Sequence, residues 1–162
     1  MNTEFATRPM MSSDSSRLKE IVDLSFSRIL GLFALHSLQE EGQVFVAETR
    51  GSLAVGFAKL IMFQVGGASF GCILWLAVHP QFRRKGIATA LVNVGVEYLK
   101  RAGARAVFAS VQRRNSDSLT VFGREGFREM GFLELQRLFG WRIFKFYRDI
   151  WLAPGEVVLM HS

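Results

Sequence analysis

The chain has 162 residues, of which 49% are hydrophobic and 21% charged. This length favours one domain over residues 1–162, and the composition excludes a disordered chain. The net charge of +6 favours anionic partners, although it can equally serve general solubility. The single cysteine excludes an intramolecular disulfide and favours a reducing, cytoplasmic compartment, and the three scattered histidines give no metal-binding pattern.

The first half of the chain alternates between strand and helix patterns. A short strand ends near Pro9, and residues 12–26 combine capping serines with apolar residues at helical spacing. A second helix is expected over about 29–38. Residues 43–49 and 53–63 are β-rich runs around a glycine-containing turn, which predicts a hairpin. The apolar runs are too short to cross a bilayer, so no membrane span is expected.

The second half predicts a strand followed by further strands and helices. Residues 69–78 are almost continuously apolar, which is typical of a central strand buried on both faces. The elements expected after it are a helix to about Ala102, a strand at 104–111, a helix at 115–126, a strand at 127–135, a helix at 137–151 and a strand at 156–161. This order predicts a mixed α/β sheet with helices packed on it.

The stretch LAVHPQFRRKGIATALV, residues 76–92, carries the strongest functional pattern. A buried strand runs into a helix, whose first backbone N–H groups and dipole favour an anion. Gly86 lets a ligand approach the backbone, and Arg83, Arg84 and Lys85 add positive charge at the same end. The pattern predicts a polyanion site, and the alternative is a solvated basic loop.

The same stretch resembles the acetyl-CoA motif of the GNAT acetyltransferase superfamily. Arg83, Gly86 and Ala88 match the family pattern Arg/Gln-x-x-Gly-x-Gly/Ala. Downstream, NSDSLTVFGREGF resembles the family's Asn-x-x-Ala-x-x-aromatic segment, with Ser118 in the alanine position. The resemblance implies an α/β (α+β) fold: a central mixed, mostly antiparallel, splayed sheet of about six to seven strands with helices on both faces.

The resemblance also implies acetyl-CoA as cosubstrate, a primary amine as acceptor and no metal. The cofactor-binding residues it implies are Leu76, Ala77, Val78, Arg83, Arg84, Lys85, Gly86, Ile87, Ala88, Thr89 and Asn115. The strand residues would pair with the pantetheine arm as an added strand does. The loop and helix start would wrap the pyrophosphate, and Asn115 would contact the amide end of the cofactor.

The proton-transfer positions of the family depart from its pattern. Relatives carry a tyrosine or a glutamate at the positions of Phe122, Ser110 and Cys72, so no catalytic residue can be carried over. The remaining candidates are Tyr147, Glu48, Cys72 and His36. Tyr147 would replace the missing acid, Glu48 would act through water, and His36 would contact the acceptor. The alternatives are a surface carboxylate, a core cysteine and a surface histidine.

Residues 137–151 form an aromatic and basic insertion between the last two expected strands. As one helix it would gather its cations on one side and its aromatic residues on the other. It is interpreted as a helix packed on the sheet, a wall of the acceptor pocket, a homodimer contact or a membrane-surface helix. The alternative function is a non-catalytic acyl-CoA-binding or sensing domain. No nucleic-acid partner is expected, because no nucleic-acid-binding motif is present.

Overall fold

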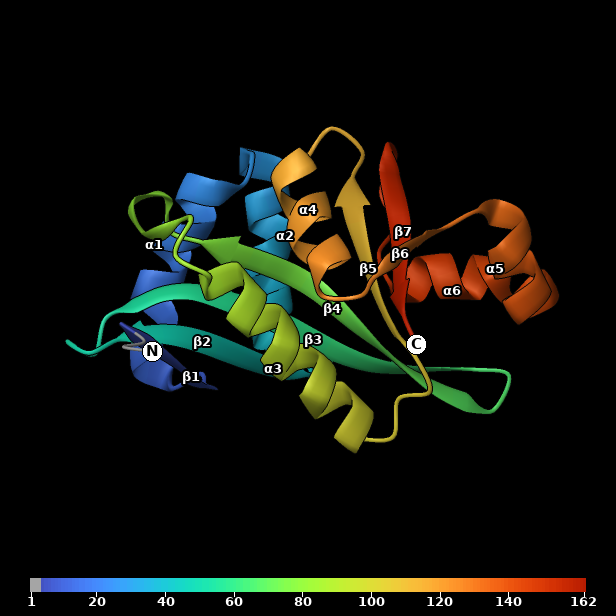
Figure 1. Cartoon of the computed structure of the whole chain (residues 1–162), viewed down its shortest axis with the longest axis horizontal. Helices are drawn as coiled ribbons and strands as arrows, with labels where there is room; N and C mark the ends of the chain where they lie inside the picture. The colour runs from blue at the N-terminus through green and yellow to red at the C-terminus, as the bar shows by residue number, and fades with distance from the viewer. Residues whose placement is uncertain (1–3) are drawn as a thin grey trace. The chain divides into compact units, whose positions relative to one another are not determined.

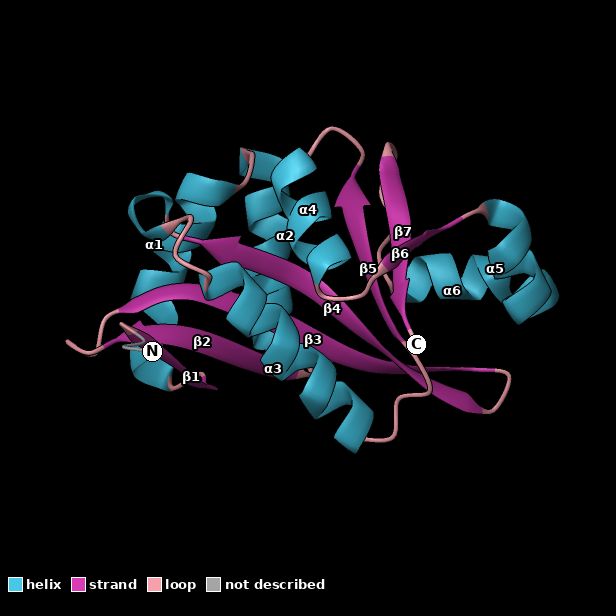
Figure 2. Ribbon diagram, in the orientation of Figure 1, coloured by secondary structure: helices cyan, strands magenta, loops and turns pink. Residues whose placement is uncertain are grey.

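The computed structural model describes residues 4–162, and its strands form one open sheet in the order β1-β2-β3-β4-β5-β7-β6 (Figures 1 and 2). The strands are β1 (Phe5–Pro9), β2 (Gln43–Thr49), β3 (Ala54–Val65), β4 (Ala68–Val78), β5 (Val107–Gln112), β6 (Arg128–Met130) and β7 (Glu156–His161). The α-helices are α1 (Ser15–Ser25), α2 (Arg28–Gln39), α3 (Ile87–Arg101), α4 (Ser116–Arg124), α5 (Phe132–Phe139) and α6 (Ile143–Asp149). Strands β4 and β5 pair in parallel, whereas β1–β2, β2–β3, β5–β7 and β6–β7 are antiparallel. The predicted mixed, mostly antiparallel α/β fold is confirmed.

The chain divides into two compact units, each described by itself below. Unit 1 contains residues 4–60 and 75–95, and unit 2 contains residues 61–74 and 96–162. Strands β3 and β4 and helix α3 each contribute residues to both units. The division therefore falls within continuous elements rather than in a linker.

In unit 1, helices α1 and α2 cover one face of strands β2 and β3. The helix predicted from residues 12–26 forms as α1, and its fully buried Leu18, Ile21 and Val22 follow the helical period. They share an apolar cluster with Phe57 of β3. Helix α2 starts at Ser27, whose hydroxyl accepts a hydrogen bond from the backbone N–H of Leu30.

The other face of unit 1 is covered by the first turns of α3. Neighbouring residues of a strand point to opposite faces of the sheet, so Gly56 faces away from the side on which Phe57 packs against α1. A Cβ atom at Gly56 would lie 3.2 Å from side-chain carbons of Ile87 and Leu91, and 3.0 Å from the carbonyl oxygen of Ala77. The absence of a side chain at Gly56 thus allows α3 to approach the sheet closely. Helices cover both faces of this part of the sheet.

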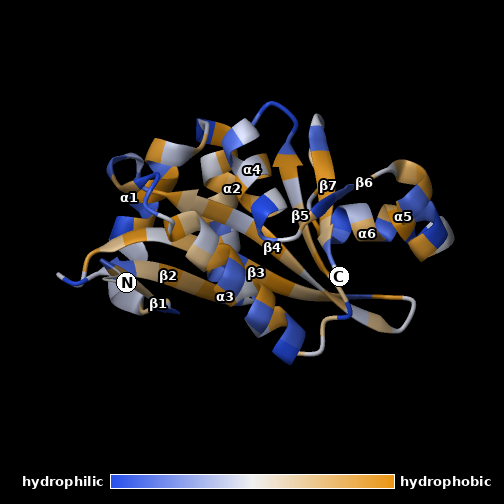
Figure 3. Ribbon diagram, viewed as in Figure 1, coloured by the Kyte–Doolittle hydropathy of each residue, from blue (hydrophilic) through white to orange (hydrophobic). Residues whose placement is uncertain are grey.

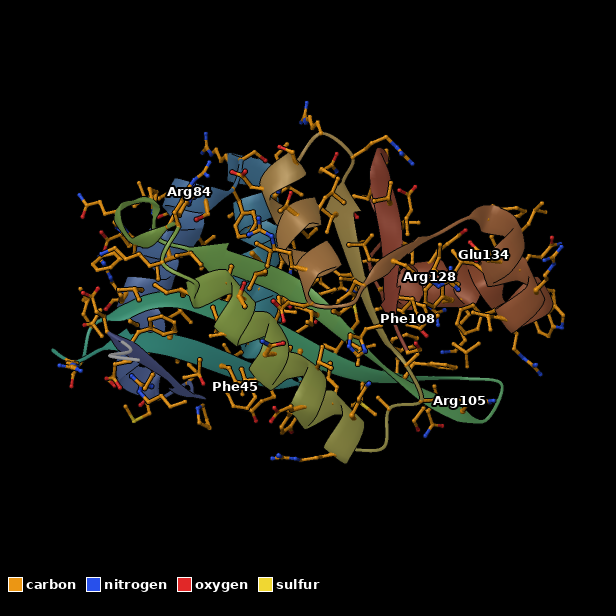
Figure 4. The ribbon with its side chains drawn as sticks, viewed as in Figure 1. Phe45, Arg84, Arg105, Phe108, Arg128 and Glu134 are labelled. Carbon is orange, nitrogen blue, oxygen red and sulfur yellow. The ribbon has the colours of Figure 1, made fainter. Side chains whose placement is uncertain are left out.

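In unit 2, helices α5 and α6 bury a set of phenylalanine rings against strands β3, β4 and β5. The ring of Phe146 lies 4.4 Å from that of Phe139 and 4.8 Å from that of Phe108, measured between centroids. Phe63 and Phe70 complete the group. Figure 3 shows hydrophobic colouring along β3, β4 and β5, and Figure 4 marks Phe108 on β5. The insertion therefore forms part of the hydrophobic core.

Two secondary-structure predictions in this region are wrong. The strand expected at 127–135 is limited to β6, and α5 begins at Phe132. The Glu134 carboxylate accepts a 2.9 Å hydrogen bond from the backbone N–H of Gly131, and this cap favours a helix start. The single helix expected at 137–151 is divided, because Gly140 adopts a positive φ of 57°.

Candidate functional site

The loop after β4 is held in place by His79. Its backbone N–H donates to the carbonyl of Val55 at 2.8 Å, and its Nδ1 accepts from the backbone N–H of Gln81. The ring is buried, and its Nε2 lies 3.6 Å from the carboxylate of Glu20 on α1. Both ring nitrogens therefore have partners within unit 1, which favours a structural role over a catalytic one.

Arg83 also stabilises this loop. Its Nε donates to the carbonyl of Val78 at 3.0 Å, and its guanidinium reaches the Ser25 hydroxyl at 3.5 Å. The residue was predicted to bind the cofactor as the first position of the motif. In this structure its side chain connects the loop to the end of β4 and to α1.

The next residues bend the backbone so that several N–H groups are available together. Arg84 and Gly86, on either side of Lys85, have φ values of 62° and 78° (Figure 4 marks Arg84). Left-handed residues within a turn aim successive backbone N–H groups into an anion-binding concavity. Helix α3 begins directly afterwards, and the Ala90 N–H donates to the Gly86 carbonyl at 3.0 Å. This is the first hydrogen bond of the helix, so the backbone N–H groups of residues 86–89 have no partner within the helix.

Space and charge at this loop also suit an anion. A Cβ atom at Gly86 would meet no other atom within 4 Å, so its backbone is accessible. Lys85 is half exposed and 3.9 Å from the carboxylate of Glu4, and Arg84 is exposed. The positive end of the α3 dipole lies at the same place. Backbone donors, dipole and cations together can bind a phosphate group.

Strand β4 contributes residues to the apolar clusters of both units. Strand β3 supplies Ala54 and Phe57 to the unit 1 cluster, and Ile61, Phe63 and Val65 to the unit 2 cluster. Strand β4 supplies even-numbered residues to the unit 2 cluster and odd-numbered ones to the unit 1 cluster, namely Phe70, Cys72 and Leu74, then Trp75 and Ala77.

Asn115 caps the start of α4 in unit 2. Its side-chain oxygen accepts a 3.1 Å hydrogen bond from the Ser118 N–H, and its own N–H donates to the Gln112 carbonyl. Asn115 or Ser116 was expected to cap this helix, and the structure assigns the cap to Asn115. Because the cap uses the oxygen, the side-chain NH2 is the group with which a ligand would interact.

Among the candidate proton-transfer groups, Cys72 is fully buried in the unit 2 cluster. Burial raises the pKa of its thiol, and the charge of Glu156 raises it further. The thiolate is the reactive form of cysteine, and this environment disfavours it. Cys72 is therefore interpreted as a residue of the hydrophobic core. Phe122 is also buried, with its ring against Phe127, and Ser110 pairs in register with Val158 of β7.

Glu48 and His36 each have a charged neighbour within unit 1. The Glu48 carboxylate accepts a 2.8 Å hydrogen bond from Arg8, which also binds Asp14 at 2.8 Å. His36 is exposed, and its Nε2 lies 3.0 Å from Glu40, one turn along α2. The ion pair at Glu48 favours a structural role for this carboxylate. The exposure of His36 favours its interpretation as a surface histidine.

Tyr147 differs from these candidates. It lies on α6, partly buried against the unit 2 cluster and next to the ring of Phe146. Burial raises the pKa of its hydroxyl, so the group keeps its proton at neutral pH. A phenol in this state can act as a proton donor.

Sequence reasoning missed several contacts that connect distant residues. The Arg8–Asp14–Glu48 network and the His79–Glu20 pair join elements far apart in the chain, and no local pattern indicates them. The indole N–H of Trp75 is buried, and within residues 4–162 no hydrogen-bond acceptor meets it. Trp75 packs edge-on against Phe26 with ring centroids 5.3 Å apart.

Residues 4–162 contain neither a metal-binding cluster nor a membrane-spanning helix. No three His, Cys, Asp or Glu side chains in this range gather into a group that could hold a metal ion. No helix in the same range is both long enough and apolar enough to cross a membrane.

The fold is that of an α/β protein, and its strand–loop–helix corner after β4 presents backbone donors and cations. The family model of the acetyltransferase (GNAT) family matches residues 10–127. Since this match covers most of the sequence, the chain belongs to the GNAT acetyltransferase family.

Individual relatives are more distant. The chain is 29% identical over 107 residues to an N-alpha-acetyltransferase of Sulfurisphaera tokodaii, covering 60% of this chain and 64% of that protein. It is 42% identical over 52 residues to an uncharacterized N-acetyltransferase of Methanocaldococcus jannaschii, covering 32% of this chain and 23% of that protein. The matches thus cover less than two thirds of either relative.

Solved structures share the fold across nearly the whole chain. A GNAT-family acetyltransferase from Staphylococcus aureus superposes with a TM-score of 0.70 at 14% identity, covering 97% of this chain and 98% of that one. A chain of the NatC complex bound to Gag peptide and CoA gives a TM-score of 0.68 at 21% identity, covering 97% of each chain. At these sequence identities, the similarity to the solved structures shows a shared fold only.

Proposed function

We propose that this protein transfers an acetyl group from acetyl-CoA to a primary amine, carried by a small molecule or a protein. The observation that carries the proposal is the loop before α3. Arg84 and Gly86 have positive φ, and Lys85 and the free N–H groups of the helix start lie beside them. Membership of the acetyltransferase family supports the same reaction.

In this proposal the pyrophosphate of acetyl-CoA binds the backbone N–H groups from Lys85 to Thr89, and Arg84 and Lys85 add charge. The backbone of Leu76, Ala77 and Val78 pairs with the pantetheine arm as an added strand. Arg83 acts indirectly, by holding the loop against Val78. Asn115 stays a predicted cofactor contact through its side-chain NH2.

The reaction forms a C–N bond and breaks the thioester C–S bond. The free amine attacks the acetyl carbonyl, and the negative charge on its oxygen would be stabilised by a backbone N–H near Val78. The tetrahedral intermediate expels the CoA thiolate. The nitrogen loses one proton, and the thiolate gains one. Positioning of amine and thioester supplies a large part of the acceleration.

Phe122 and Ser110 carry no ionisable group, and the Cys72 thiol is buried and protonated. Tyr147 is therefore proposed as the general acid for the thiolate, because its phenol carries a proton at neutral pH and can donate it. The loss of the family's usual acid and base favours the second candidate function, an acyl-CoA-binding domain without catalysis.

Calorimetry with acetyl-CoA, combined with release of free CoA in the presence of a panel of amines and peptides, separates these functions. We expect acetyl-CoA binding and an acceptor-dependent release of CoA. Binding with no release on any acceptor would support the sensing domain. Absence of binding would contradict both functions.

Replacement of Tyr147 by Phe removes the proposed proton donor and little else. We expect kcat to fall about tenfold to a hundredfold, with KM for acetyl-CoA nearly unchanged, because general acid catalysis contributes an effect of about this size. The high-pH limb of the kcat profile should also be lost, since it reports loss of this proton.

Tyr98 offers a matched control, because it is the other of the two tyrosines of the chain and lies on α3. Tyr98→Phe should leave kcat and its pH profile unchanged. Equal kcat values for Tyr147→Phe and the unmodified protein would exclude Tyr147 as the acid.

A further inference from the structure

Segment 132–151, which contains α5 and α6, exposes an unusual amount of apolar surface in unit 2. Trp141 is 79% exposed, Phe144 74% and Leu133 65%, and Phe132 and Leu138 are each more than half exposed. The same segment also supplies the buried Phe139 and Phe146. Only some of the apolar residues of the segment are buried in the core, and the others face outward.

Cations lie beside these exposed apolar side chains. Each helix has one face in the core, and the residues about half a turn away face outward. On α5 this outward face carries Leu133 and Arg137, and on α6 it carries Phe144 and Arg148, each pair separated by four residues. Between the helices, the guanidinium of Arg142 lies over the ring of Trp141, 5.3 Å from its centroid.

The carboxylates of the segment are already paired. Glu134 binds Arg128 at 2.7 Å and the Gly131 N–H at 2.9 Å (Figure 4 labels Arg128 and Glu134). Asp149 pairs with Lys145 and Arg148. Segment 132–151 contains four cations and two carboxylates, so its outward surface is positively charged as well as apolar.

The segment is firmly attached, so this surface does not depend on a flexible arm. Phe139 and Phe146 stack at 4.4 Å inside the unit 2 cluster. The Lys145 ammonium donates to the Gln64 carbonyl at 2.7 Å, which joins α6 to the end of β3. The backbone that carries the exposed side chains is thus anchored to the rest of unit 2. Figure 3 shows hydrophobic and hydrophilic colouring alternating along both helices.

We propose that the outward surface of segment 132–151 binds an anionic membrane surface, a property beyond the proposed acetyl transfer and independent of it. Exposed Trp and Phe side chains next to Arg and Lys are the composition that segments lying in the membrane interface use. A second copy of the chain is the less favoured occupant. A two-fold contact would place this surface against itself, and cations would then face cations.

The test uses the full chain with vesicles of phosphatidylcholine alone, or with about one third of the lipid replaced by phosphatidylserine. We expect sedimentation with the anionic vesicles only, weakened at high salt because screening reduces the attraction. The double variants Trp141→Ser/Phe144→Ser and Arg137→Gln/Arg148→Gln should each weaken binding about tenfold or more.

Matched controls remove similar groups from other surfaces. Ile29→Ser/Leu32→Ser removes two exposed apolar residues of α2, and Arg28→Gln/Arg101→Gln removes two exposed charges. Both should bind vesicles like the unmodified protein, and circular dichroism checks that all variants fold.

Three outcomes would overturn the proposal. The first is no sedimentation with anionic vesicles. The second is equal weakening by the charge control, which would assign binding to the overall charge of the chain. The third is a dimer in light scattering that Trp141→Ser/Phe144→Ser dissociates, which would assign the surface to a second copy.

Discussion

Replacement of Gly86 by Asn is expected to weaken acetyl-CoA binding about a hundredfold. Asn tolerates the left-handed backbone better than other side chains, so the φ of 78° and the fold should persist. The new side chain would enter the space that is open above Gly86, where the proposed pyrophosphate meets the backbone. Losing one or two charge-assisted hydrogen bonds from that backbone accounts for an effect of this size. Isothermal titration with acetyl-CoA measures it.

Gly103 provides the control for this variant. It has a φ of 96°, and a Cβ atom there would also meet no other atom within 4 Å. It lies in the turn between α3 and β5, away from the motif. Gly103→Asn should therefore carry a similar backbone cost and bind acetyl-CoA normally. Unchanged affinity in Gly86→Asn would mean that the phosphate site is misassigned.

Replacement of Phe146 by Ala should lower the free energy of unfolding by about 3–5 kcal/mol. The side chain is 0% exposed and contacts the rings of Phe63, Phe108 and Phe139. Its removal costs the burial of an aromatic ring and leaves a cavity among rings that cannot easily move to fill it. Urea-induced unfolding followed by circular dichroism measures the change.

Phe144, two residues away on α6, has the same side chain but is exposed. Phe144→Ala should change the free energy of unfolding by less than about 0.5 kcal/mol. If the two variants lose similar stability, α6 does not pack on the sheet as described. This pair also separates the two roles of segment 132–151, because Phe146 serves the core and Phe144 the proposed membrane surface.

Most elements of the fold were predictable because their signals are local. The apolar spacing of α1, the hairpin around residues 50–52 and the apolar run of β4 each express a regular periodicity. Residues 131–142 were predicted incorrectly, because their aromatic residues suit a strand or a helix equally well. The Gly131–Glu134 cap favours the helix, and the positive φ of Gly140 ends it.

The candidate site was predictable only in part. The motif located the loop and the helix start, and it could not show that Arg83 holds the loop while Arg84 and Gly86 shape the backbone. The structural environments of Glu48 and Cys72 depend on Arg8 and on the phenylalanine cluster, which lie far away in sequence. Contacts between residues so far apart in sequence produce no periodic pattern in the sequence.

The sequence by itself determined the family and the position of the proposed phosphate-binding loop. Both depend on short-range constraints, namely the backbone freedom of Gly86 and the donors of the helix that follows. Only the tertiary structure decided which aromatic residues of segment 132–151 form the core and which face outward. That choice depends on the volume that β3, β4 and β5 leave to be filled, which close packing fixes and no stretch of sequence specifies alone.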